Sequence, residues 1–137
     1  MYKHIAVCVD GSQNAMRATA QAVELAKVCE GVRVDLLSVI AIDVYADMVY
    51  DPVATHGDAQ AELVSPAVQA FEEVGVKPEL VLLHGRPAEE IINYVEESDV
   101  DLLVMGSRGL NAFQEFAIGS VSHKVLKHVK CPALVVK

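Results

Sequence analysis

Short runs of apolar residues recur along the chain, and between them apolar residues return every three or four positions. The continuous runs cover residues 3–9, 32–40, 79–83, 101–105 and 132–136. A run that is apolar at nearly every position is typical of a strand in a parallel sheet, because helices cover both faces of such a sheet. The pattern therefore predicts five buried strands.

Helical spacing fills the intervals between these runs. Ser12 is a favourable N-cap for a first helix, and Gly31 is a natural stop after it. Pro87 suits the first position of a later helix, because that position needs no N–H donor. The expected buried positions are Ala15, Ala18, Ala22, Leu25, Ala26 and Cys29 in the first helix, Ile91, Ile92 and Val95 in the helix after Pro87, and Val121, Val125 and Val129 in the last.

A further helix is predicted over residues 58–73, but Pro66 lies inside it. Because proline lacks an N–H and crowds the preceding turn, it predicts either a kink or a helix that begins near Ser65. The segment before it, residues 42–57, has no clean period and is expected to be a long loop or to contain a short helix. A surface crossover is the preferred interpretation of that segment, and a flap near a ligand is the alternative. The expected buried positions of the helix are Leu63, Ala67, Phe71 and Val74.

The alternation of strands and helices predicts the α/β class, as a Rossmann-like, doubly wound, five-stranded parallel sheet with helices on both faces. In such sheets, ligands bind beyond the carboxyl ends of the strands, where the direction of the chain switches. The length of 137 residues predicts a single domain that covers residues 1–137.

Composition narrows the class of partner. The chain is 53% hydrophobic and 22% charged, which is typical of globular rather than disordered proteins. A formal net charge of -8 argues against nucleic acid and anionic membranes as partners. No run approaches the ~18 apolar residues that a membrane span needs. Asp10 and Arg17 interrupt the first apolar run, so a secretory leader is not expected.

The cysteines and histidines give no sign of a metal or catalytic centre. Cys8, Cys29 and Cys131 are odd in number and lie in apolar segments, so we expect buried thiols in a reducing cytoplasm. His123 and His128 are five positions apart and would not share a helix face. The sequence shows no Ser-His-Asp or Cys-His arrangement, so we assign no catalytic residue and no metal ligand.

The stretch from residue 106 to residue 122 is the strongest functional signal. Gly106 and Gly109 follow a predicted strand, and Gly119 and Ser120 precede a predicted helix. Glycine permits close approach of the backbone to a ligand, and a helix N-terminus offers unpaired N–H groups. Together these features predict an anion site for phosphate, with the N–H groups of Gly119 and Ser120 facing it. The stretch matches neither the dinucleotide fingerprint nor the Walker P-loop.

The spacing Gly-x2-Gly-x9-Gly-Ser resembles the ATP-binding signature of the universal stress protein family. Residues 5–12 are similar to that family's first strand and turn, residues 85–91 to the start of its third helix, and residues 125–136 to its last helix and strand. The resemblance therefore spans the whole chain. It implies the strand order 3-2-1-4-5, which would bring Asp10 beside Gly106.

The resemblance also implies roles for individual residues. Asp10 would hold the ribose or adenine, although a helix N-cap is an equally good interpretation of that residue. Val39 would meet adenine through its backbone, and Met105 would be an apolar neighbour of the base. Arg108 and Lys124 would reach phosphate or stay solvated. The family's phosphate and ribose contacts match Gly106, Gly109, Gly119, Ser120, Val121 and Ser122.

The function implied is that of an ATP-binding regulatory protein of the stress response, with Mg²⁺ carried by the nucleotide and a homodimer formed through the final strand. One alternative is a slow ATPase or phosphotransferase, and another is a nucleotide-free interaction module. Phe113 and Glu115 depart from common family members, and an acidic side chain close to a triphosphate would weaken binding. Enzyme activity is expected to be at most slow ATP hydrolysis.

Overall fold

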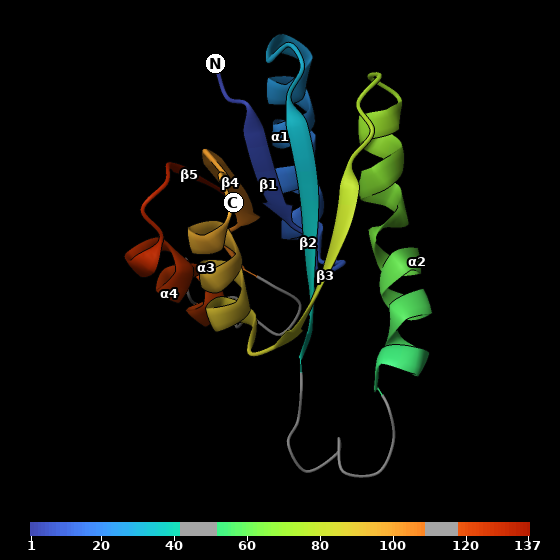
Figure 1. Cartoon of the computed structure of the whole chain (residues 1–137), viewed down its shortest axis with the longest axis vertical. Helices are drawn as coiled ribbons and strands as arrows, with labels where there is room; N and C mark the ends of the chain where they lie inside the picture. The colour runs from blue at the N-terminus through green and yellow to red at the C-terminus, as the bar shows by residue number, and fades with distance from the viewer. Residues whose placement is uncertain (42–51, 109–117) are drawn as a thin grey trace.

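A computed structural model describes residues 1–41, 52–108 and 118–137, and shows a parallel sheet with helices on both faces (Figure 1). The strand order is β3-β2-β1-β4-β5. The predicted fold class and strand order are therefore confirmed. The strands are β1 (His4–Cys8), β2 (Arg33–Ala41), β3 (Glu79–Gly85), β4 (Leu102–Gly106) and β5 (Ala133–Val136), and the helices are α1 (Gln13–Val28), α2 (Pro52–Glu72), α3 (Pro87–Glu97) and α4 (Ser120–His128).

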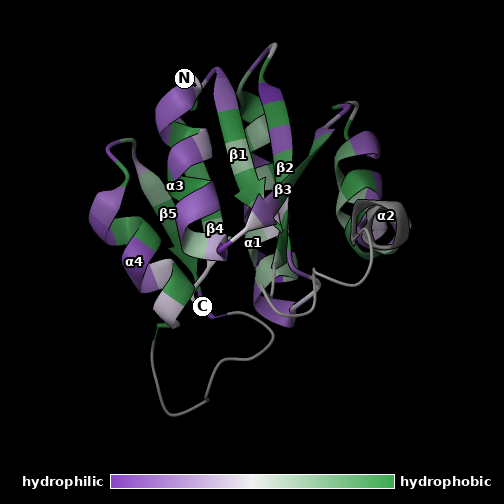
Figure 2. Ribbon diagram, turned by 60° about the horizontal axis from the view of Figure 1, so that its bottom comes forward, coloured by the Kyte–Doolittle hydropathy of each residue, from purple (hydrophilic) through white to green (hydrophobic). Residues whose placement is uncertain are grey.

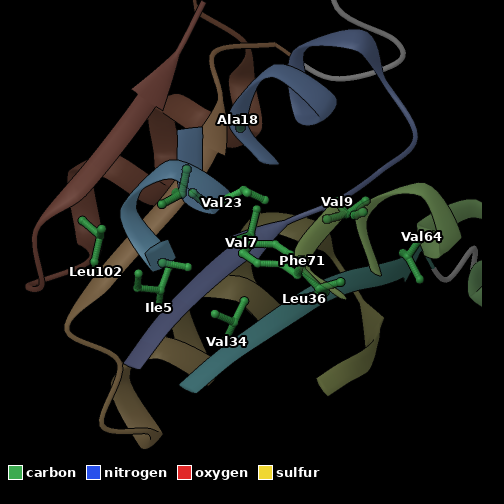
Figure 3. Close-up of a cluster of buried hydrophobic side chains, with 14 residues drawn as sticks. Ile5, Val7, Val9, Ala18, Val23, Val34, Leu36, Val64, Phe71 and Leu102 are labelled. Atoms are coloured by element: carbon green, nitrogen blue, oxygen red, sulfur yellow. The ribbon is translucent and has the colours of Figure 1, made fainter. Parts of the chain in front are cut away.

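The sheet divides the interior into two apolar cores. Because side chains alternate between the faces of a strand, Ile5 and Val7 of β1 join one core and Ala6 joins the other. The first core lies under α1 and α2, where Phe71 is fully buried (Figure 3). The second lies under α3 and α4 and includes Val125. Figure 2 shows the hydrophobic middle of β1 with α3 and α4 in front of the sheet.

The first helix begins where the sequence predicts. Oγ of Ser12 accepts a hydrogen bond of 3.1 Å from the backbone N–H of Ala15, so Ser12 is the N-cap of α1. The turn before it needs Gly11, whose φ is +83°. α1 ends at Val28 with Cys29 as its C-cap, and the chain then turns toward β2 through Gly31, whose φ is +71°.

The second helix differs from its prediction at its start. α2 begins at Pro52 rather than near residue 58 and continues through Pro66, so a helix start near Ser65 is wrong. Pro66 removes a hydrogen bond to the carbonyl of Glu62, which lies on the exposed side where water can replace it. Buried residues of α2, including Phe71, hold the helix against the sheet. Residues 42–51 of the loosely patterned segment lie outside the described residues.

The three cysteines are free thiols, but only Cys29 is buried. Cys8 and Cys131 are partly exposed, so the expectation that all three are buried is wrong. Cys8 ends β1 at the carboxyl edge of the sheet, and Cys131 precedes the edge strand β5. Neither position is covered on every side, because both lie at the border of the fold.

The topology places a switch point between β1 and β4. β1 pairs on one side with β2 and on the other with β4, and all of these pairs are parallel. The connection after β1 leads to α1 on one face of the sheet, whereas the connection after β4 leads to α4 on the other. The two connections therefore diverge from the carboxyl ends of β1 and β4, which leaves a crevice between them.

Candidate functional site

A cavity of about 400 Å³ opens over the carboxyl ends of β1, β2 and β4. It lies at the switch point, and residues of all four helices contribute to its walls. Gly109, the remaining predicted site residue, lies outside the described residues. The structure brings the other predicted residues together around this cavity: Asp10, Val39, Met105, Gly106, Arg108, Gly119, Ser120, Val121 and Ser122.

The first turn of α4 forms one end of the cavity. Gly119 is the N-cap, and Ser120, Val121 and Ser122 are the first three residues of the helix. Their N–H groups have no acceptor within the helix, because the acceptors would lie before its start. The first turn contains no acidic residue, so the partial positive charge of the helix terminus is not neutralised there. This end of the cavity is therefore suited to an anion.

The N–H of Gly119 has a different role from the one predicted. It donates a 2.6 Å hydrogen bond to the carbonyl of Ser107, so it is already used within the protein. The prediction that this N–H faces phosphate is wrong. Gly119 has φ -77° and ψ 163°, an extended conformation that any residue adopts. Its N–H joins the N-cap of α4 to the residue that follows β4.

Two serines attach this end of the cavity to the sheet. Oγ of Ser122 donates a hydrogen bond of 2.8 Å to the carbonyl of Gly106, so the Ser122 hydroxyl proton is not available to a ligand. The N–H of Ser107 donates a 2.8 Å hydrogen bond to the carbonyl of Val136 in β5. Ser120 is exposed, which leaves its hydroxyl accessible. As a hydrogen-bond donor, Ser122 therefore offers a ligand only its backbone N–H, whereas Ser120 offers both its N–H and its hydroxyl.

Gly106 is required by the packing of α1 against β4. A Cβ at Gly106 would lie 2.8 Å from Cβ of Asn14 and 2.9 Å from its backbone carbon. Asn14 is buried, and its Nδ2 donates a 3.3 Å hydrogen bond to Oγ of Ser107. Arg17 donates a hydrogen bond to Oδ1 of Asn14. Sequence reasoning missed Asn14, although a polar residue at the second position of α1 was a usable signal.

Asp10 lines the cavity just beyond β1. Its Oδ1 accepts a hydrogen bond of 2.9 Å from the backbone N–H of Ser12, which stabilises the turn into α1. Because Ser12 itself is the N-cap, the alternative that Asp10 caps the helix is wrong. Within the described residues, Oδ2 of Asp10 makes no hydrogen bond. That oxygen is the acceptor that the site offers to a hydroxyl group.

The end of the cavity near β2 carries the apolar side chains of Val39 in β2 and Leu63 in α2. Ile91 of α3 and Met105 of β4 add apolar surface to the walls. Cys8 also lines the cavity, and burial together with the nearby charge of Asp10 raises the pKa of its thiol to about 12. The thiol is therefore neutral at physiological pH. An apolar wall of this kind accommodates a flat ring better than a charged group.

Sequence reasoning missed the contributions of α2 and α3 to the cavity. Gln60 and Leu63 come from α2, and Pro87 and Ile91 from α3. The helical spacing predicts Leu63 and Ile91 only as buried core positions. A single sequence does not show which end of a helix lies close to a ligand.

The two cations near the predicted phosphate site are separated by the fold. Arg108 lines the cavity. Lys124 does not line it, and its Nζ lies 3.3 Å from Oε1 of Glu89 in α3. Position 124 is on the part of α4 that faces α3, and this pairing favours the alternative that Lys124 is a solvated side chain.

Comparison with known proteins identifies the family. The model of the universal stress protein family matches residues 1–137. The chain belongs to this family. Universal stress protein YxiE of Bacillus subtilis is 32% identical over 148 residues, with 100% of both chains covered.

Solved structures agree with this membership. The hypothetical protein MJ0577 superimposes with a TM-score of 0.88 at 30% identity, covering 100% of this chain and 96% of the other. A universal stress protein from Archaeoglobus fulgidus in complex with dAMP superimposes with a TM-score of 0.74 at 25% identity, covering 99% and 98%. The universal stress protein fold therefore extends over the whole chain. Among the described residues, each helix is too short or too polar to cross a lipid bilayer.

Proposed function

We propose that this universal stress protein binds ATP in the cavity, with Mg²⁺ carried on the phosphates, and that the nucleotide acts as a regulatory signal. The first turn of α4 carries the proposal. It has three N–H groups without helical acceptors, those of Ser120, Val121 and Ser122, and all three residues line the cavity. No acidic residue in that turn opposes a phosphate group.

The ribose and the adenine of a nucleotide would contact the remaining walls of the cavity. Asp10 would accept hydrogen bonds from the ribose hydroxyls, because its Oδ2 has no other partner in the described part of the chain. Val39 and Met105 would contact adenine at the apolar walls. The relative from Archaeoglobus fulgidus binds dAMP, which supports an adenine nucleotide as the ligand. Arg108, at the cavity wall, would lie near the phosphates.

The proposal assigns no catalytic residue. Nucleotide binding would act as a signal through three segments near the cavity: the end of β4, the start of α4 and the edge strand β5. β5 is connected to this region because the carbonyl of Val136 accepts a hydrogen bond from the N–H of Ser107. We further propose that two chains associate through β5. Nucleotide binding would then act close to the contact between subunits.

The first experiment identifies the ligand. Mass spectrometry of small molecules released from freshly purified protein is expected to show an adenine nucleotide. Calorimetric titration of the stripped protein with Mg-ATP measures the affinity directly. Single-turnover measurements on the same sample are expected to show slow hydrolysis at most, and rapid turnover would overturn the regulatory role.

The second experiment replaces Gly119 with valine. The backbone at this position is extended, so Gly119→Val introduces no backbone strain, but its isopropyl group would occupy space at the cavity wall. We expect loss of ATP binding with a melting temperature close to that of wild type. A hundredfold excess of Mg-ATP over the dissociation constant should stabilise wild type by about 2.7 kcal/mol and the variant not at all. Unchanged ATP binding by a folded Gly119→Val would mean that the phosphate site is elsewhere.

A further inference from the structure

One polar side chain of α2, Gln60, reaches the cavity wall in a defined orientation. Oγ of Ser38 donates a hydrogen bond of 2.5 Å to Oε1 of Gln60. Ser38 lies in β2 and is only 1% exposed, so its hydroxyl is held in place by the surrounding sheet. The amide oxygen therefore faces Ser38.

This orientation determines what Gln60 can offer to a ligand. The amide oxygen is occupied by Ser38, so the NH₂ group points away from that hydroxyl. Across residues 1–41, 52–108 and 118–137, no group accepts a hydrogen bond from the amide nitrogen. Gln60 is half-buried and lines the cavity. It therefore presents donors, rather than an acceptor, to whatever occupies this end.

Gln60 lies some distance from the anion-binding end of the cavity, measured across the strands of the sheet. Ser38 belongs to β2, whereas the first turn of α4 follows β4, and β1 lies between these two strands. Two strand spacings amount to about 10 Å. A nucleotide whose phosphates contact α4 would extend its base toward β2. Val39, next to Ser38 in β2, is the residue we assign to the base.

We propose that Gln60 is a specificity-determining residue that donates a hydrogen bond to a ring nitrogen of a purine base. The inference rests on the proposed nucleotide-binding function of the same cavity. Purine ring nitrogens are acceptors, and the apolar neighbours Val39 and Leu63 offer no competing side-chain hydrogen bond. Ser38 is a positioning residue, because it holds the amide with its donors toward the cavity.

The test combines variants with altered ligands. Gln60→Leu removes the amide, and Gln60→Glu keeps an oxygen for Ser38 but removes the donor. Gln69→Leu is the matched control, because Gln69 is exposed on the same helix and does not line the cavity. We expect both Gln60 variants to bind Mg-ATP about five- to tenfold more weakly and the control to bind as wild type does. Ser38→Ala should show a smaller loss.

Analogues of ATP that lack one ring nitrogen (1-deaza, 3-deaza and 7-deaza) locate the acceptor. Wild type should bind one of the three about five- to tenfold more weakly than ATP, whereas Gln60→Leu should bind that analogue and ATP equally well. Gln60→Glu repeats the comparison if the leucine variant does not fold.

Two results would overturn the assignment of Gln60 while leaving nucleotide binding intact. One is an affinity of both Gln60 variants for Mg-ATP within twofold of wild type. The other is a folded Gln60 variant that still discriminates against the same deaza analogue as wild type does. Absence of Mg-ATP binding by wild type itself would instead remove the proposed function and this inference together.

Discussion

At Asp10, one carboxylate both stabilises the chain and faces the cavity. Its Oδ1 accepts the N–H of Ser12, and the residue lines the cavity beside the end of β1. Because Ser12 caps α1 through its own side chain, the helix keeps its cap when Asp10 is replaced. The structure thereby separates two roles that the sequence alone left open.

We therefore expect Asp10→Ala to affect ligand affinity more than stability. Loss of hydrogen bonds to a charged acceptor should weaken ATP binding by about 1.5–3 kcal/mol. The melting temperature should fall only slightly, because one turn hydrogen bond is lost. Calorimetric titration and thermal melting of the same preparation measure both effects, and a large loss of stability with unchanged affinity would contradict the role in binding.

Gly106 gives the opposite prediction. A methyl group there would lie 2.8 Å from Cβ of Asn14, and the nearby backbone of α1 cannot easily move. Gly106→Ala should therefore lower the free energy of unfolding by about 1–3 kcal/mol, as overpacking does. Urea denaturation measures the loss. Gly119→Ala is the control, because its extended backbone accepts a side chain and its stability should stay close to wild type.

Gly106 shows which features of a single residue the sequence predicts and which it does not. The sequence predicts that Gly106 contributes to a ligand site, and the structure places it at the wall of the cavity. The reason for a glycine at that position was missed, because it depends on Asn14, far away in the sequence, packing against β4. The two alternatives for Lys124 stayed open for the same reason, because its partner Glu89 belongs to another helix. Contacts between distant segments leave no local pattern.

At the scale of elements, a polar network centred on the buried residues His4 and Asp35 joins the amino ends of β1 and β2 to α3 and the residues after it. The ring nitrogens of His4 lie 2.6 Å from Oδ2 of Asp35 and 2.6 Å from Oδ1 of Asp99. Asp35 is fully buried and also accepts hydrogen bonds from Tyr94 and Arg33. Burial and the hydrogen bond to Asp35 raise the pKa of Tyr94 to about 12.

This network predicts part of the acid sensitivity of the protein. The hydrogen bond from His4 lowers the pKa of Asp99 from its usual value of 3.8. The unfolded chain therefore takes up a proton before the folded one as the pH falls, and the contribution of Asp99 to stability is lost below about pH 4. Asp99→Asn should reduce the pH dependence of the free energy of unfolding below that pH.

Urea denaturation between pH 2.5 and pH 7 measures this dependence. Glu24→Gln is the control, because Glu24 pairs with Lys27 at the exposed surface of α1 and should leave the slope unchanged. Equal slopes for wild type and Asp99→Asn would show that the contact with His4 does not stabilise the folded state.

The boundaries of the elements were predictable where a local group determines them. Ser12 caps the start of α1 through a side-chain hydrogen bond, Gly31 turns the chain after its end through a positive φ, and both are readable from residue type. The start of α2 was not predictable in this way. Pro66 is tolerated because burial of residues such as Phe71 compensates for the missing bond, and burial depends on the assembled sheet.

At the scale of the whole molecule, β5 is an edge strand, with β4 as its only neighbour among the strands of the described residues. Residues Ala133–Val136 are all partly exposed, although they are hydrophobic. An edge of this kind favours pairing with another chain. We expect light scattering to give twice the chain mass of 14.8 kDa at micromolar concentration. Val135→Lys should shift the mass toward the monomer without changing the far-UV circular dichroism, and a monomeric wild type would contradict the proposed dimer.

The order of the strands along the chain also determines when the cavity comes into existence. Residues 1–41 can pair β1 with β2 early, but Ala6 pairs with Leu103, and the first turn of α4 follows later still. During synthesis, the walls on both sides of the switch point are complete only after nearly the whole chain has left the ribosome. A bound nucleotide therefore cannot assist the early steps of folding. It can only protect the finished protein, so cellular ATP would influence how long each molecule survives rather than how fast it forms.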